Sequence, residues 1–277
     1  MRKLLILLSL LVVLISCDKD KFKAKDASFI VVNSASVKAT PSQGTNSNKI
    51  VDIWYYFNDE FKGVFPIGSK MPILGNGNAT VKLFAGIKNN GISATRLPYE
   101  FYESYSFTQD IVQGATYSIS PIFSYLKSVQ FPIIETFEAG GYTFKSVGST
   151  PFDVITDPNK VFEGTGKSFY MEMTDVNPIS EIKTSTPIQL PLGGATIYLE
   201  LNYKCNQVIE VGVIGGGTEY RQALAINPSE EWNKIYIQLT SPVSTQPTYN
   251  FYDVYIRATK QVDAPQIFLD NIKLVTR

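Results

Sequence analysis

Short runs of β-branched and aromatic residues, separated by turn residues, dominate this chain and most constrain its fold. In the first half, the best candidates for strands are 28–33, 50–57, 61–65, 79–84, 99–107 and 116–119. Val, Ile, Thr, Tyr and Phe favour a pleated sheet, whereas Gly, Asn, Asp and Pro favour turns. The 16 Tyr and 17 Phe against 4 Met agree with this pattern. The sequence therefore predicts an all-β protein.

The composition excludes several functions. Because 25 Lys and Arg balance 25 Asp and Glu, we expect no basic surface for nucleic acid. The chain has no His, which removes Ser-His-Asp and Cys-His nucleophiles and imidazole zinc sites. Gly166-Lys167-Ser168 copies the end of a nucleotide-binding P-loop, but Val161 stands where the loop needs Gly. Most common hydrolase mechanisms and nucleotide binding are therefore not expected.

The first 16 residues are typical of a secretory signal peptide. Arg2 and Lys3 precede an apolar run, 4–15, which is too short for the roughly 20 residues of a spanning helix. The run ends in Leu14-Ile15-Ser16-Cys17, which resembles the bacterial lipobox. The resemblance implies that Cys17 receives a diacylglyceryl group and becomes an acylated N-terminus. We therefore expect a lipid anchor that holds the protein to a membrane.

Residues 17–26 predict a charged, solvated tether. An Asp directly after the lipidated Cys resembles the inner-membrane retention signal of enteric bacteria. Short Lys- and Asp-rich stretches at this place also resemble the surface-export signals of Bacteroidota lipoproteins. We favour an outer-membrane location in the cell envelope and leave the face, periplasmic or external, open. If Cys17 carries lipid, Cys205 has no disulfide partner, and we expect it to be a small buried residue.

Residues 27–126 predict a first β-sandwich. Asn58-Asp59-Glu60 followed by Gly63 indicates a hairpin, and Gly75-Asn76-Gly77-Asn78 leads from 71–74 into the apolar strand 80–83. This order resembles the PEGA type of small β-sandwich and related transthyretin-like modules. The resemblance implies an immunoglobulin- or transthyretin-like domain that acts as an envelope spacer or display module. We expect 86–92 to be a long turn and 99–107 to be an edge strand.

Residues 133–277 predict a second sandwich. Five short sequence segments follow one another along this region. They are Phe137-Glu138, Gly164–Ser168 before a strand, Tyr198–Lys204, Glu231–Ile235 and a terminal Leu269–Leu274. Together they resemble the jelly roll of carbohydrate-binding modules and galactose-binding-like domains. The resemblance implies that the first and last strands pair antiparallel. It also implies a structural Ca²⁺ held by Glu138 and Asp270, although the residues leave calcium open because no dense run of acidic ligands supports it.

Period-two alternation assigns faces to three strands of this region, around 197–205, 235–239 and 253–257. If the three strands belong to one sheet, one exposed face carries the residue types that a glycan site needs, aromatic rings and planar polar groups. This candidate ligand-binding face consists of Tyr198, Glu200, Asn202, Tyr236, Gln238, Asp253, Tyr255 and Arg257. Any outer sheet face with cross-strand pairs has the same composition. We expect Trp232 to be a buried anchor.

Three functions from different classes follow. The first is a non-catalytic envelope lipoprotein that binds glycans through the jelly roll. The second is a structural or accessory subunit of an outer-membrane protein complex. The third and most remote is a glycosidase with two carboxylates, which needs no His. The adjacent pairs Asp59/Glu60 and Glu230/Glu231 do not provide its geometry, because neighbours on a strand face opposite ways. We therefore expect no catalytic residues.

Overall fold

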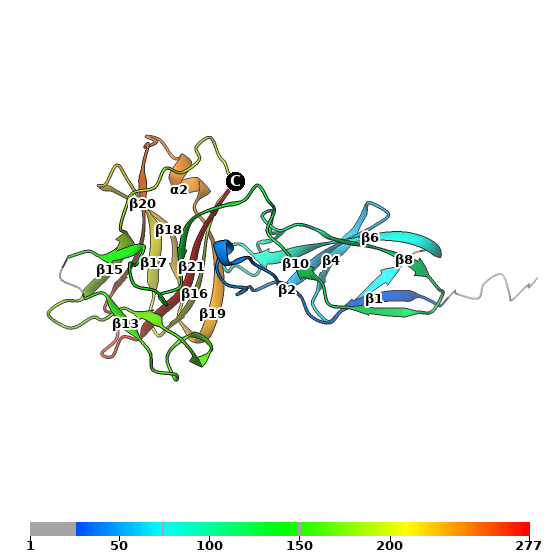
Figure 1. Ribbon diagram of the computed structural model, residues 1–277, viewed down its shortest axis with the longest axis horizontal. Helices are drawn as coiled ribbons and strands as arrows, with labels where there is room; N and C mark the ends of the chain where they lie inside the picture. The colour runs from blue at the N-terminus through cyan, green and yellow to red at the C-terminus, as the bar shows by residue number, and fades with distance from the viewer. Residues whose placement is uncertain (1–25, 74, 149–150) are drawn as a thin grey trace, which may run out of the picture.

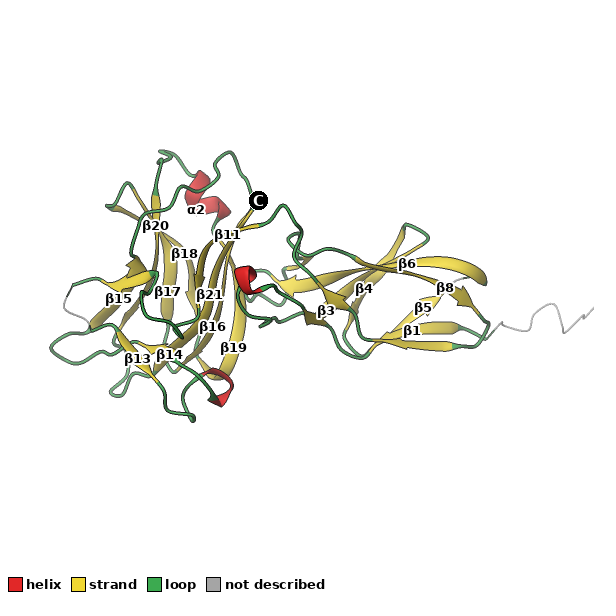
Figure 2. Ribbon diagram, in the orientation of Figure 1, coloured by secondary structure: helices red, strands yellow, loops and turns green. Residues whose placement is uncertain are grey.

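The computed structural model describes residues 26–73, 75–148 and 151–277. The predicted signal peptide, Cys17 and all of the tether except Asp26 lie outside the described residues. Two lobes follow one another along the long axis, and nearly all their regular structure is strand (Figures 1 and 2). The protein is all-β, with two β-sandwiches, as predicted. Within the described ranges, no helix has the length and apolar character needed to cross a membrane.

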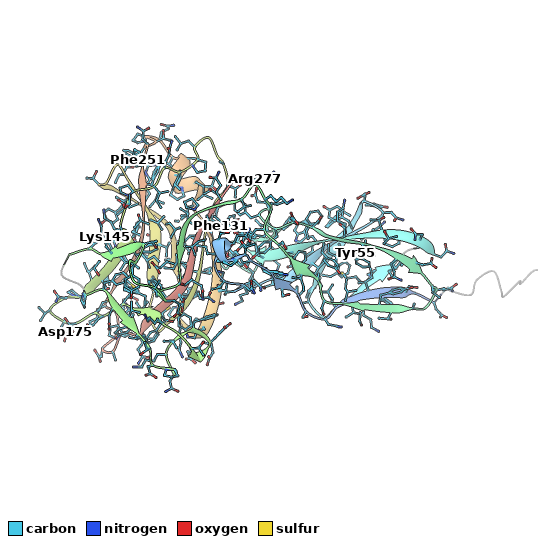
Figure 3. The ribbon with its side chains drawn as sticks, in the orientation of Figure 1. Tyr55, Phe131, Lys145, Asp175, Phe251 and Arg277 are labelled. Atoms are coloured by element: carbon cyan, nitrogen blue, oxygen red, sulfur yellow. The ribbon has the colours of Figure 1, made fainter. Side chains whose placement is uncertain are left out.

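The N-terminal lobe contains the strands up to residue 123. One sheet is built from β3 (Asp52–Phe57), β4 (Glu60–Pro66), β6 (Gly77–Lys88), β7 (Arg96–Pro98) and β8 (Tyr105–Ile111). Facing it are β1 (Ser28–Val32), β2 (Ser36–Val37), β5 (Lys70–Ile73), β9 (Thr116–Ile119) and β10 (Ile122–Phe123). The buried apolar side chains between them, including Tyr55, form the core of this lobe (Figure 3).

The predicted hairpin between β3 and β4 is confirmed. Asn58 and Asp59 adopt positive φ angles of 51° and 62°, the combination that a tight turn between right-twisted strands requires. Gly63 lies at φ 145°, where the register of the two strands shifts. The turn residues in the sequence therefore specified both the hairpin and its bulge.

Two local predictions in this lobe are wrong. The expected turn 86–92 begins only after Lys88, because β6 continues through Gly86 and Ile87 to pair with β7. The expected edge strand 99–107 contributes only its last residues, from Tyr105, to β8. The aromatic side chains of Tyr99 and Phe101 are buried in irregular backbone at the junction of the lobes. Tertiary packing there overrides the local strand preference.

The C-terminal lobe is a sandwich of two sheets. The first, here called the inner sheet, contains β11 (Gln130–Glu135), β13 (Asp153–Ile155), β14 (Ser168–Tyr170), β16 (Ile197–Cys205), β19 (Ser229–Gln238) and β21 (Ile267–Thr276). The second, the outer sheet, contains β12 (Phe144–Ser146), β15 (Ile179–Thr184), β17 (Ile209–Gly215), β18 (Glu219–Ile226) and β20 (Tyr252–Thr259). The helical pieces are short: η2 (Pro41–Gln43), η3 (Phe162–Gly164) and α2 (Thr240–Ser244).

Two predictions for this lobe are confirmed. Its first and last strands, β11 and β21, pair antiparallel. Cys205 is a free, buried residue of the core, and burial raises the pKa of its thiol, which keeps it protonated and unreactive. The chain passes between the lobes near Phe131, which packs edge-to-face on Tyr125 with ring centroids 4.9 Å apart (Figure 3).

Candidate functional site

The inner sheet has one face in the core of the C-terminal lobe. Its other face is covered by the N-terminal lobe. Tyr198 on β16 and Tyr236 on β19 are only 1% and 2% exposed and belong to the same apolar cluster as the core of the N-terminal lobe. The ring of Tyr99 lies 5.4 Å from that of Tyr198 and 4.9 Å from that of Tyr236. The two lobes therefore share one continuous aromatic interface.

Polar contacts fix the relative position of the lobes. The turn after β6 lies against the edge strand β19, where the Asn90 N–H donates to the Tyr236 carbonyl over 2.9 Å and the Gln238 N–H donates to Asn90 Oδ1 over 2.8 Å. The Tyr198 hydroxyl donates to Asn89 Oδ1 over 3.0 Å. An edge strand with unpaired backbone groups is thereby partly capped by the other lobe.

A buried charge cluster lies at the centre of this interface. Glu200 is 0% exposed, and its Oε1 accepts hydrogen bonds from the hydroxyls of Tyr99 (2.8 Å) and Tyr125 (2.9 Å). Its Oε2 lies 3.1 Å from Lys234 Nζ. Burial, followed by the Glu200 carboxylate, raises the pKa of Tyr99 well above its usual range. One carboxylate therefore acts as the acceptor for groups of both lobes.

Lys273 adds a second ammonium to this cluster. Its Nζ donates to the Thr45 carbonyl over 2.5 Å and lies 5.3 Å from the centre of the Tyr125 ring. Burial lowers the pKa of Lys273 to about 8, while the Glu200 carboxylate partly offsets that effect. Two lysines thus face one buried glutamate, so the interface depends on that glutamate.

The predicted ligand-binding face is wrong as a single exposed surface. Tyr198, Glu200, Asn202 and Tyr236 are buried in the interface between the lobes, and Gln238 is half-buried. The strand that carries the other three residues, β20, belongs to the opposite sheet. Alternation along a strand separates its two faces, but it does not say which neighbour covers either face.

Asp253, Tyr255 and Arg257 lie together on the outer sheet, where their polar groups are already paired. The Tyr255 hydroxyl donates to Glu210 over 2.6 Å, and Arg257 donates to both oxygens of the same carboxylate. Lys183 Nζ lies 3.1 Å from Asp253. Tyr255 is 0% exposed, and its ring lies against Gly212, where an added Cβ would clash with both the Arg221 carbonyl and the Tyr255 ring. This surface is a network of cross-strand pairs.

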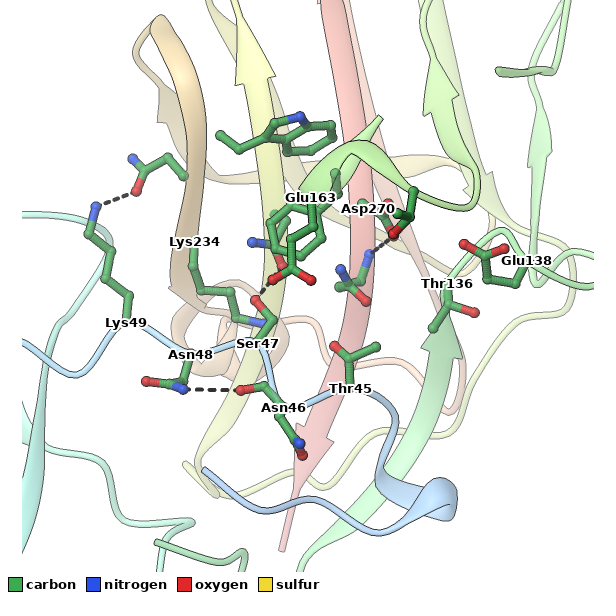
Figure 4. Close-up of a pocket in the computed structure, with 16 residues that line it drawn as sticks. Thr45, Asn46, Ser47, Asn48, Lys49, Thr136, Glu138, Glu163, Lys234 and Asp270 are labelled. Atoms are coloured by element: carbon green, nitrogen blue, oxygen red, sulfur yellow. Dashed lines mark hydrogen bonds between the residues drawn. The ribbon is translucent and has the colours of Figure 1, made fainter. Parts of the chain in front are cut away.

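A cavity of about 650 Å³, here called the interlobe pocket, opens beside the aromatic interface (Figure 4). The segment 45–49 of the N-terminal lobe forms one wall, and η3, the residues after β11 and the middle parts of β16, β19 and β21 form the others. Its lining consists of Thr45, Asn46, Ser47, Asn48, Lys49, Thr136, Glu138, Phe162, Glu163, Thr165, Asn202, Trp232, Asn233, Lys234, Asp270 and Asn271. Both lobes are therefore needed to form it.

The walls of the interlobe pocket combine an aromatic pair with amide side chains. Trp232 is half-buried and packs edge-to-face on Phe162, with ring centroids 5.4 Å apart. Its Nε1 is buried without a hydrogen-bond partner. The amides of Asn46, Asn48, Asn202, Asn233 and Asn271 surround the cavity. Trp232 was expected to be a buried anchor, whereas the structure places it on the wall of a cavity.

The 45–49 segment is held over the inner sheet by specific contacts. The Ser47 hydroxyl donates to Asn202 Oδ1 over 2.7 Å, and the Lys49 N–H donates to the Tyr236 hydroxyl over 3.0 Å. The Lys49 ammonium donates to Asn233 Oδ1 (Figure 4). Sequence reasoning missed this segment, because a polar run without periodicity reads as an ordinary loop. The only available signal was its unusual density of amide and hydroxyl side chains.

The structure brings Glu138 and Asp270, the residues nominated for calcium, to the same wall of the interlobe pocket. Asp270 accepts hydrogen bonds from the Ser168 hydroxyl and the Asn271 N–H, both at 2.6 Å. Glu138 accepts from the Lys167 N–H over 2.9 Å. The run 166–168 that imitates a P-loop therefore holds these two carboxylates.

The environment of Asp270 is unfavourable for a bare negative charge. Burial raises the pKa of Asp270 to about 7, the two hydrogen bonds oppose this effect, and the carboxylates of Glu138 and Glu135 add to it. Neighbouring carboxylates that disfavour one another's charge are a suitable place for a hard cation. Within the described ranges, no group of three or more His, Cys, Asp or Glu could hold a metal ion, so carbonyls, hydroxyls and water must complete any calcium shell.

Comparison with known proteins gives similarity only among solved structures. No family model and no curated protein matches the chain. The xylan-binding CBM22-1 domain of Xyn10C from Paenibacillus barcinonensis is 12% identical, covers 54% of this chain and 96% of its own, and has a TM-score of 0.40. A family 29 carbohydrate-binding module complexed with mannohexaose is 11% identical, covers 53% and 91%, and has a TM-score of 0.36.

Proposed function

We propose that this protein binds a glycan in the interlobe pocket and does so without catalysis. The observation that carries the proposal is the Trp232–Phe162 pair beside amide side chains from both lobes. An aromatic ring packs against the apolar C–H face of a sugar, and planar amides exchange hydrogen bonds with its hydroxyls. The unpaired Nε1 of Trp232 adds a donor that a small shift of the ring would make available.

The outer sheet supports glycan binding less well. Its charged groups already satisfy one another, as the contacts of Glu210 with Tyr255 and Arg257 illustrate. The exposed aromatic side chain there is Tyr220, which is 43% exposed but donates its hydroxyl to Glu181 over 2.7 Å. A ligand on this surface would have to break these bonds before it gained new ones.

Replacing Trp232 with Ala is expected to weaken glycan binding by at least about tenfold, because it removes the ring on which a sugar packs. A glycan array first identifies the glycans to which the purified protein binds. Titration calorimetry with each of them then measures the affinity of the variant. Asn46→Ala, on the facing wall, is expected to weaken binding by a smaller factor. Asn46 is exposed, but its Oδ1 accepts a hydrogen bond from the Ala39 N–H over 2.8 Å, so circular dichroism is used to check that the variant is folded.

Tyr220→Ala is the matched control, since it removes an exposed aromatic ring from the other sheet. We expect binding unchanged in this variant. If Tyr220→Ala abolished binding and Trp232→Ala did not, the ligand would lie on the outer sheet, and the assignment to the interlobe pocket would be wrong.

We also propose that Glu138 and Asp270 hold a structural Ca²⁺. At a free concentration about 100-fold above its Kd, a cation that binds only the folded state stabilises it by about 2.7 kcal/mol. Millimolar CaCl₂ is therefore expected to raise the Tm by several degrees in a calorimetric scan, and EDTA to reverse the shift. Asp270→Asn should remove the shift, and Asp175→Asn, an exposed carboxylate outside the pocket, should keep it. An equal shift with MgCl₂ would contradict a calcium site.

The lipid anchor at Cys17 and the outer-membrane location stay predictions from the sequence. They are compatible with a glycan-binding role, because a tethered module would hold a polysaccharide at the cell surface. The accessory-subunit alternative would be favoured if affinity capture from membranes gave one stoichiometric protein partner while the glycan array gave no ligand.

A further inference from the structure

A second cavity, of about 450 Å³, lies beside the interlobe pocket and is here called the lysine pocket. Lys49, Asn233 and Lys234 line both cavities. The contact between the Lys49 ammonium and Asn233 Oδ1 therefore lies where the two cavities meet. A ligand longer than one sugar unit would extend from one cavity into the other along this side of the junction between the lobes.

The charge of the lysine pocket differs from that of its neighbour. The interlobe pocket is lined by Glu138, Glu163 and Asp270 together with two lysines. The lysine pocket is lined by Lys49, Lys88 and Lys234, and no Asp or Glu is among the residues that line it. Its remaining walls are apolar or amide side chains, such as Ile235 and Asn227.

The carboxylates nearest to these lysines already have cationic partners. Glu200 lies 3.1 Å from Lys234, and it also faces Lys273. Asp52, which is fully buried, lies 3.3 Å from Arg96. In the part of the chain that the structure describes, no carboxylate lies within ion-pair distance of Lys49 or Lys88. Five cationic side chains therefore surround two carboxylates in this region.

Glu200 is the counter-charge of Lys234, whereas Lys49 and Lys88 have none within ion-pair distance among the described residues. Lys234 is only 3% exposed, and no hydrogen bond of acceptable geometry is made by its Nζ, although Glu200 is close. Burial and the nearby ammonium of Lys88 lower the pKa of Lys49, which means that the two ammoniums repel one another across the cavity. An anion placed between them would relieve this repulsion and replace the neutral contact of Lys49 with Asn233.

We propose that the lysine pocket binds the anionic substituent of an acidic polysaccharide, a carboxylate or a sulfate, while the neighbouring sugar lies in the interlobe pocket. This inference rests on the proposed glycan binding and specifies its substrate class. In this arrangement the ammoniums of Lys49 and Lys88 contact the anion, and the buried ammonium of Lys234, which also lines the cavity, adds positive charge.

The test uses two pairs of polysaccharides that differ in charge but share a backbone. Polygalacturonate is compared with its methyl ester, and dextran sulfate with dextran, by titration calorimetry at low and high NaCl. In at least one pair the acidic member is expected to bind about tenfold tighter than the neutral one, and the difference should shrink as salt screens the charges. The pair that responds identifies carboxylate or sulfate as the recognised group.

Lys88→Gln and Lys49→Gln are expected to remove most of this preference, since each deletes one charge at the cavity and leaves a polar side chain that is only one atom shorter. Lys62→Gln is the control, because Lys62 lies on β4 and pairs with Glu60. An equal loss in Lys62→Gln would show attraction by general charge and overturn the inference.

The two proposals fail in different ways. If neutral and acidic members bind equally and both lose affinity in Trp232→Ala, glycan binding holds and the lysine pocket is not an anion site. If an acidic member binds and depends on Lys88 but not on Trp232, the anion site holds and the interlobe pocket is not the sugar site. If none of these polysaccharides and no glycan on the array binds, both proposals are wrong.

Discussion

Replacing Glu200 with Ala is expected to lower the free energy of unfolding by about 3–5 kcal/mol, the cost typical of removing one partner from a buried ion pair. The substitution leaves the ammonium of Lys234 buried without a counter-charge and removes the carboxylate that faces Lys273. It also removes the acceptor of the Tyr99 and Tyr125 hydroxyls. Guanidinium denaturation followed by circular dichroism measures the loss.

Glu210→Ala is the matched control for this prediction. Glu210 forms an ion pair of similar length with Arg257, at 2.9 Å against 3.1 Å for Glu200 and Lys234, but both of its side chains are partly exposed on the outer sheet. A partly exposed pair contributes about 0–1 kcal/mol, and the hydrogen bond from the buried Tyr255 hydroxyl adds about 1 kcal/mol, so the expected loss is about 1–2 kcal/mol. Glu200→Gln is expected to fall between the two, since an amide oxygen still accepts from the tyrosines. Equal losses for Glu200→Ala and Glu210→Ala would contradict the placement of Glu200 in a buried interface.

Replacing Tyr236 with Ala is expected to destabilise the protein by about 3–5 kcal/mol, because the substitution leaves a cavity where a large buried ring packed. The ring lies against Tyr99, and its hydroxyl accepts from the Lys49 N–H. Limited proteolysis is expected to cut the variant faster near Phe131, where the chain passes between the lobes. Chemical denaturation gives the free energy.

Tyr236→Phe separates the hydroxyl from the ring and is expected to cost about 1 kcal/mol. Tyr220→Ala, on the outer sheet, removes a partly exposed ring and its hydrogen bond to the buried carboxylate of Glu181, and is expected to cost about 1–2 kcal/mol. A stable Tyr236→Ala protein with reduced glycan binding would instead mean that this ring is free to contact ligand. Trp232→Ala is the better probe of binding, because Trp232 is only half-buried and lines the cavity.

Much of the fold could be predicted from local sequence. The Asn58-Asp59 turn, the strand that follows Gly77 and the burial of Cys205 each depend on residues close in sequence or on the nature of one side chain. The antiparallel pairing of β11 with β21 came from a family resemblance rather than from local preference. The failed prediction at 99–104 concerns aromatic residues whose partners lie about 100 positions away, such as Glu200.

The candidate site was predicted only in part. Glu138 and Asp270 were nominated together and do share a wall of the interlobe pocket, although their role with calcium stays a prediction. The eight residues of the proposed ligand-binding face were divided between a buried interface and the opposite sheet. The 45–49 segment and Lys88 were missed, because a loop and a strand end acquire a binding surface only when another lobe packs beside them.

By itself, the sequence determined the all-β class, the position of the tight turns and the two alternating faces of each strand, since backbone preference and side-chain period act over a few residues. Only the tertiary structure decided which face of each sheet is exposed to solvent. The outer surface of the inner sheet carries Tyr, Glu and Asn, as an exposed sheet would, yet the N-terminal lobe covers it and supplies hydroxyl and amide partners for those groups. Burial depends on what packs against a surface, and that partner is remote in sequence.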